Sequence, residues 1–180
     1  MAATTGSMTV EQFWQLPEDQ AFHYELHHGE LVEVSRLKWK HVLIQWRIRD
    51  LLKALFGALG IVETEVPFRP LPEHELRAAD VAFVSRERAA SVDEDDALHG
   101  APDSVIEVLS RSNTVAEIAE RRAICLENGS REFWTVDSNR REIKVSTPDG
   151  FTRTYKSGDS IPLALAGNQT LTVDAVFTDE

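Results

Sequence analysis

The chain has 180 residues, of which 42% are hydrophobic and 27% are charged, and its formal net charge is −11. This size and composition are typical of one globular domain with a hydrophobic core, and no apolar run reaches the roughly 20 residues of a membrane-spanning helix. The acidic balance argues against a protein that coats nucleic acid through counterion release, although it does not exclude an enzyme with a local basic surface.

The ends and the single thiol set the expected boundaries and compartment. The N-terminus lacks the basic and apolar segments of a secretory signal, so we expect residues 1–8 to form a disordered tail and residues 9–180 to form a single domain. Cys125 is the only cysteine, which excludes an internal disulfide and favours a reducing, cytoplasmic setting.

Periodicity and turn signals predict four elements in the first half of the chain. They are a short helix over 9–15 capped by Thr9, two strands over 24–35 around His27 and His28, a long helix over 37–59, and a strand over 61–68 that stops near Pro67. The long helix is indicated by apolar residues at helical spacing, namely Val42, Leu43, Trp46, Leu51, Leu52, Leu55 and Phe56.

The second half alternates strands with one further helix. The pattern predicts buried strands over 81–84 and 104–109, a helix over 114–127 that opens on a Thr114–Glu117 capping box, strands over 133–136, 142–147 and 151–155, and a last strand over 171–177. This order predicts an α/β (α+β) fold in which helices flank a mixed β-sheet.

Two acidic residues interrupt the buried strands. Glu107 lies inside an apolar strand, where an unpaired carboxylate would carry a large desolvation cost, and Asp80 opens the other short strand. Two such acids can converge on Mg²⁺, which needs only one or two carboxylates. The alternative is a structural ion pair between Glu107 and an arginine, with Arg77, Arg121 and Arg122 as candidates.

Two other clusters suggest weaker hypotheses. His23, His27 and His28 could indicate zinc, but a strand and a turn do not place them on one face. The basic stretch 36–49, in which Trp39 and Trp46 are interleaved, is a candidate DNA-facing surface; its alternative is a core helix with a charged outer side.

A set of short runs, in a fixed order, resembles one family. The runs are Tyr24-Glu25-Leu26, Gly29 to Val32, His41, Ala79 to Val84, Gly100 to Asp103, Glu107 to Ser110 and Gly129 to Asp137. From about Val10 to Phe177 the chain is thereby similar to the Uma family of putative restriction endonucleases, a branch of the PD-(D/E)XK nuclease superfamily.

The resemblance implies a restriction-endonuclease-like core with a divalent metal held by Asp80, Glu107 and the backbone carbonyl of Val108. The family lysine falls at Arg121, which keeps the positive charge and can clamp phosphate but cannot serve as a base. Arg122 is the alternative at the site.

Helical geometry favours Arg122 over Arg121 as the inward-facing residue. A predicted core stripe contains Arg122, while Arg121 belongs to a flanking stripe. The core stripe is Val115, Ile118, Ala119 and Leu126, and the flanking stripe is Glu117, Arg121 and Cys125. The resemblance favours Arg121, and we expect this residue at the site.

The expected function is an Mg²⁺- or Mn²⁺-dependent endonuclease acting on DNA. No membrane partner is expected, and the resemblance implies a homodimer. Asp80, Glu107 and Arg121 would be catalytic, and His41, Lys40 and Arg122 would contact phosphate. One rival is a catalytically weakened member of the fold that serves as a DNA-binding or protein-interaction module. The other is a structural protein in which Glu107 only pairs with Arg122.

Overall fold

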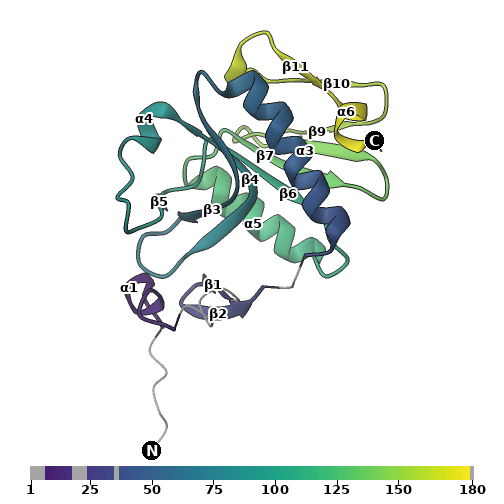
Figure 1. The fold of residues 1–180 in the computed structure, drawn as a ribbon. Coiled ribbons are helices and arrows are strands. Elements are labelled where there is room, and N and C mark those ends of the chain that lie inside the picture. Colours follow the sequence, from purple (N-terminus) through teal and green to yellow (C-terminus); the bar gives the residue numbers. More distant parts are fainter. Residues whose placement is uncertain (1–6, 18–23, 35–36, 179–180) are drawn as a thin grey trace, which may run out of the picture.

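The computed structural model describes residues 7–17, 24–34 and 37–178, and its main elements are β-strands separated by two long helices (Figure 1). In chain order they are α1 (Val10–Phe13), β1 (Tyr24–His27), β2 (Glu30–Glu33), α3 (Trp39–Phe56), β3 (Gly60–Arg69), β4 (Arg77–Ser85), α4 (Arg86–Ala89), β5 (Leu98–His99), β6 (Ser104–Val108), α5 (Val115–Glu127), β7 (Glu132–Asp137), β8 (Glu142–Ser146), β9 (Thr152–Tyr155), β10 (Ser160–Pro162), a 3₁₀ turn η1 (Ala164–Ala166), β11 (Thr170–Thr172) and α6 (Val173–Phe177).

A seven-stranded mixed sheet organises the fold. Its order is β5-β3-β4-β6-β7-β8-β9, and two small two-stranded sheets, β1-β2 and β10-β11, accompany it. β4 lies antiparallel between β3 and β6, whereas β6 and β7 run parallel and are joined through α5. A parallel pair needs such a crossover connection, which explains the helix at this point of the sequence.

The two long helices cover the sheet (Figure 1). α3 contacts β3, β4 and β6, and α5 contacts β7. Two helix ends match the local sequence signals: α5 opens on the capping box of Thr114 and Glu117, and α3 ends at Gly57. The fold class expected from the sequence is therefore confirmed.

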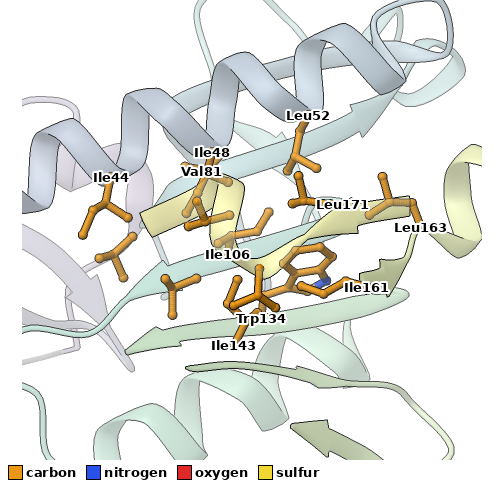
Figure 2. Packing of buried hydrophobic residues seen from close by; sticks show 14 of the residues in the cluster. Ile44, Ile48, Leu52, Val81, Ile106, Trp134, Ile143, Ile161, Leu163 and Leu171 are labelled. Carbon is orange, nitrogen blue, oxygen red and sulfur yellow. The ribbon is translucent and has the colours of Figure 1, made fainter. Parts of the chain in front are cut away.

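The larger core cluster lies between α3, the sheet and the C-terminal segment (Figure 2). α3 contributes Ile44, Ile48, Leu52 and Phe56, which recur every four residues and are buried. Leu43 and Trp46, which the sequence pattern grouped with the apolar positions, are instead 39% and 41% exposed. The helix face that carries the two isoleucines, Leu52 and Phe56 packs on the sheet, so Trp39 and Trp46 on another face are exposed to solvent.

The inward side of α5 is wider than the predicted core stripe. Ile118 and Leu126 of that stripe pack against a second cluster that contains Ile124, Cys125 and Phe133, whereas Val115 at the start of the helix is 89% exposed. Arg121 and Cys125 of the flanking stripe face the protein as well. The arginine is tolerated there because the Glu25 carboxylate accepts two of its hydrogen bonds.

Three strand boundaries also differ from expectation. β3 continues through Pro67, which pairs with Ala78, because β5 pairs with β3 only at Phe68 and Arg69. A proline is compatible with a strand that has no partner on its other side at that point. β4 begins at Arg77, so that Asp80 lies within the strand instead of opening it. The expected last strand is confined to Thr170–Thr172, and the residues that follow form α6.

The structure describes part of the expected N-terminal tail and bears on the expected absence of a membrane-spanning helix. Residues 1–6 of the expected tail lie outside the described residues, while the Met8 N–H donates to the Gly29 carbonyl at 2.9 Å. Within the described parts of the chain no helix is both long enough and apolar enough to cross a bilayer.

Candidate functional site

Asp80 and Glu107 lie opposite one another on neighbouring central strands. Val81 of β4 pairs with Ile106 of β6. Because the two strands are antiparallel, the same register places Asp80, one residue before Val81, opposite Glu107, one residue after Ile106. The Val108 N–H donates to Asp80 Oδ2 at 2.7 Å and fixes that carboxylate across the two strands. The sheet thereby brings together two acids that are 27 residues apart in the sequence.

Side chains from α3 reach Asp80. The Gln45 amide nitrogen donates to Asp80 Oδ1 at 2.9 Å and also to Glu65 Oε1 at 2.8 Å. One turn earlier in the helix, His41 Nε2 lies 3.1 Å from Asp80 Oδ2. His41 therefore belongs to the acidic cluster rather than to the exposed side of α3.

Glu107 is the most deeply buried acid of the cluster, with 8% of its surface exposed. Its Oε1 lies 3.1 Å from Arg121 Nε, but these two buried atoms have no hydrogen-bond partner. Burial raises the pKa of Glu107 well above its ordinary value; Arg121 opposes this rise, and the negative charges of Asp80 and Glu25 add to it. The carboxylate is thus close to a positive charge without being satisfied by it.

Arg121 is held by a second carboxylate. Its two terminal nitrogens donate to the two oxygens of Glu25 at 3.1 Å each, and one of them also donates to the Ala78 carbonyl. His27 and the Ala78 N–H support Glu25 at 2.7 and 2.9 Å. Burial by itself would raise the pKa of Glu25, but Arg121 and His27 lower it to about 2, so this carboxylate stays ionised.

The other residues singled out from the sequence lie outside this network. Arg121, and not Arg122, reaches Glu107, and Arg122 makes no ion pair within the described part of the chain. Arg77 is engaged by Glu75 and Glu120. Lys40 is exposed near the start of α3.

The zinc hypothesis and the DNA-facing helix are also constrained by geometry. His23 lies outside the described residues, His27 contacts Glu25, and His28 contacts Glu75. On α3, Trp39 and Trp46 form an edge-to-face pair with ring centroids 5.6 Å apart. At 100° per residue these tryptophans point to a different side of the helix from His41 and Gln45, which contact the acids.

Three residues of the cluster were not singled out from the sequence, namely Glu25, Gln45 and Glu65. Gln45 follows His41 by one helical turn, and that spacing is the local signal that could have indicated it. Glu25 and Glu65 each lie in a short strand pattern, where an acidic residue on the polar side is ordinary. Only the pairing of distant strands shows that both lie near Asp80 and Glu107.

The carboxylates of the cluster are chemically suited to a hard divalent cation, although they do not surround a single point. Within the described ranges, no three acidic, histidine or cysteine side chains converge closely enough to share an ion. Carboxylate oxygens are nevertheless the ligands that Mg²⁺ and Mn²⁺ prefer, and Glu107 Oε1 is a buried oxygen without a hydrogen-bond partner. The residues therefore fit such an ion.

Comparisons with known proteins agree with this architecture. A solved structure described as a putative nuclease belonging to DUF820, from Anabaena variabilis ATCC 29413, superposes with a TM-score of 0.79 at 20% identity, over 94% of this chain and 97% of that one. The two proteins therefore share an α+β fold. No curated protein matches the sequence. The Uma2 family model, described as putative restriction endonuclease, matches residues 10–177, and the chain belongs to this family.

Proposed function

We propose that this protein is a metal-dependent endonuclease that hydrolyses phosphodiester bonds of DNA. The observation that carries the proposal is the meeting of Asp80 and Glu107 across β4 and β6 in a chain of the Uma2 family. These two acids and the backbone carbonyl of Val108 would hold Mg²⁺ or Mn²⁺, which supplies an activated water and neutralises charge on the phosphate.

The chain's own residues would orient the acids and complement the phosphate. Gln45 and the Val108 N–H fix Asp80, and Arg121 places a permanent positive charge beside Glu107. Because Arg121 is already bound by Glu25, we assign it charge compensation rather than proton transfer. We assign phosphate contacts on a longer substrate to His41, Lys40 and Arg122.

A second function is favoured by one specific observation. All three guanidinium nitrogens of Arg121 face protein acceptors, and this residue stands where the family pattern has lysine. A catalytically weakened member of the fold, acting as a DNA-binding or protein-interaction module, would have the same arrangement. For either function we propose a cytoplasmic setting, and for the endonuclease we propose a homodimer, since cutting both strands of a duplex takes two such sites.

The test is cleavage of plasmid and single-stranded DNA with Mg²⁺ or Mn²⁺ by wild type, Asp80→Ala and Arg121→Lys. Asp50→Asn is a matched control, because Asp50 is exposed on α3 and pairs with the neighbouring Arg49. We expect metal-dependent cutting by wild type and the control, and a loss of about 100-fold or more in Asp80→Ala.

Other outcomes separate the two functions. Cutting by Arg121→Lys alone would mean that the site is intact and that arginine silences it. Absence of cutting in every variant would contradict the endonuclease and favour the binding module. Equal cutting by wild type and Asp80→Ala would place the activity elsewhere.

A further inference from the structure

Two tryptophans and a leucine form an exposed apolar stripe on the outer side of α3. Trp39, Leu43 and Trp46 follow one another at intervals of four and three residues, which places them on one face of the helix. Trp39 is 66% exposed although its ring contacts that of Trp46 edge to face. The buried residues of α3 point the other way, toward the sheet. An exposed apolar stripe with charged neighbours is typical of a contact site for another molecule.

The charges of this segment favour an anionic partner. In a chain with a net charge of −11, the segment over 38–53 carries an excess of basic side chains, namely Lys38, Lys40, Arg47, Arg49 and Lys53, against Asp50. The last three of these cations have partners within the protein. Lys38 and Lys40 are exposed on either side of Trp39 in the sequence. Two copies of this face would bring like charges together, whereas a polyanion gains affinity from them by releasing counterions.

The first turn of α3 connects this exposed face to the acidic cluster. At 100° per residue, Trp39, Lys40 and His41 lead around the helix from the exposed face toward the sheet. His41 Nε2 lies 3.1 Å from Asp80 Oδ2, so the turn ends at the candidate site. A DNA strand whose backbone lies at Asp80 would therefore pass Lys40 and then meet Trp39. An indole ring stacks on a base whose face is open, which is the case in unpaired DNA and not inside a continuous duplex.

We propose that Trp39 and Trp46 form a stacking platform for unpaired bases of the DNA strand that occupies the site. Lys38 and Lys40 contact the phosphates of the same strand. This inference rests on the proposed function for DNA as the partner, and it adds the form of the substrate, which is single-stranded or locally unpaired DNA. Stacking accepts any base, so the platform provides affinity without sequence specificity. In an acidic protein it supplies attraction that the overall charge does not.

The experiment is a fluorescence-anisotropy titration of a labelled oligothymidylate with the full-length protein in the presence of EDTA, which measures binding without cleavage. Wild type is compared with Trp39→Ala, Trp39→Phe and the matched control Trp14→Ala. Trp14 is 42% exposed and forms an edge-to-face pair with Phe13, so it resembles Trp39 but belongs to the α1 region. We expect Trp39→Ala to weaken binding about tenfold, Trp39→Phe about threefold or less, and Trp14→Ala less than about twofold.

Salt dependence separates the stacking from the phosphate contacts. Lys40→Gln should make the slope of log affinity against log salt concentration less steep by about 0.7, because one phosphate contact to a single strand is lost. Trp39→Ala should lower the affinity at every salt concentration and leave that slope unchanged. A fully paired duplex should bind wild type more weakly than the oligothymidylate does, and it should bind Trp39→Ala and wild type equally.

The outcomes distinguish this inference from the function on which it rests. If Trp39→Ala binds the oligothymidylate as wild type does, or if wild type prefers the duplex, the stacking platform is wrong, whether or not the protein cuts DNA. If wild type sediments as a dimer and Trp39→Ala as a monomer of unchanged DNA affinity, the face is a subunit interface and the inference is wrong. Binding that depends on Trp39, in a protein that cuts no DNA, would uphold the inference and contradict the endonuclease. Thermal melting shows that each variant is folded.

Discussion

Arg121 Nε lies 3.1 Å from Glu107 Oε1, and yet neither buried atom has a hydrogen-bond partner. The same guanidinium makes two good hydrogen bonds to Glu25 at 3.1 Å each. Arg121 is therefore anchored by Glu25, and Glu107 only receives its charge. The distinction matters because a structural ion pair and a metal ligand respond differently to removal of the acid.

Glu107→Gln is expected to leave the apoprotein as stable as wild type to within about 1 kcal/mol, or more stable. The mutation removes a carboxylate whose pKa is raised by burial, and Arg121 keeps Glu25 as its partner. A raised pKa means that the ionised form costs stability, so the advantage of the mutant should grow as the pH rises above the ordinary pKa of 4.5 and level off above the raised pKa of Glu107. Urea denaturation of both proteins without metal, at several pH values, measures this difference in unfolding free energy.

Arg121→Met supplies the contrasting control for that measurement. Removing the cation shared by two buried carboxylates should cost about 3–5 kcal/mol of unfolding free energy. If Glu107→Gln were equally destabilising, Glu107 would be one half of a structural pair, and the metal-ligand role assigned to it would lose its support.

Glu25→Gln should show a pH dependence of the opposite sign. Arg121 and His27 lower the pKa of Glu25 from 4.5 to about 2, although burial opposes the shift. The stabilisation from ionised Glu25 is present above pH 4.5 and is lost as the pH falls toward 2. The difference in unfolding free energy between wild type and Glu25→Gln should therefore be largest near pH 7 and shrink below pH 4.5. A difference that stays constant from pH 7 to pH 3.5 would contradict the ion pair.

Cys125 is expected to resist thiol reagents in the native protein. It is buried on α5 one turn after Arg121, and desolvation raises its pKa to about 12, so almost no thiolate exists at pH 8. Because it is the only cysteine, labelling reports a single site. Reaction with a chromogenic disulfide should be slow in buffer and complete in denaturant. Rapid native labelling would mean that α5 opens readily.

Local patterns were sufficient for most elements of the fold. The capping box of Thr114 and Glu117 and the hairpin of β8 and β9 follow from residues close in sequence, and both occur in the structure. The inward side of α5 was not predictable in the same way. Hydrophobic periodicity correctly placed Ile118 and Leu126 toward the core, but it did not indicate that Arg121 also faces inward, where the carboxylate of Glu25, 96 residues away in the sequence, accepts its hydrogen bonds.

The sequence by itself determined the fold class, the family, and the two acids placed in apolar strands, because burial of a carboxylate leaves a visible mark in a hydrophobic run. Only the tertiary structure decided that Arg121 rather than Arg122 meets Glu107, and that Gln45 joins Asp80 to Glu65. These contacts link residues from separate strands and helices. Their positions depend on the pairing of β3, β4 and β6 and on the packing of α3 and α5, which no local pattern contains.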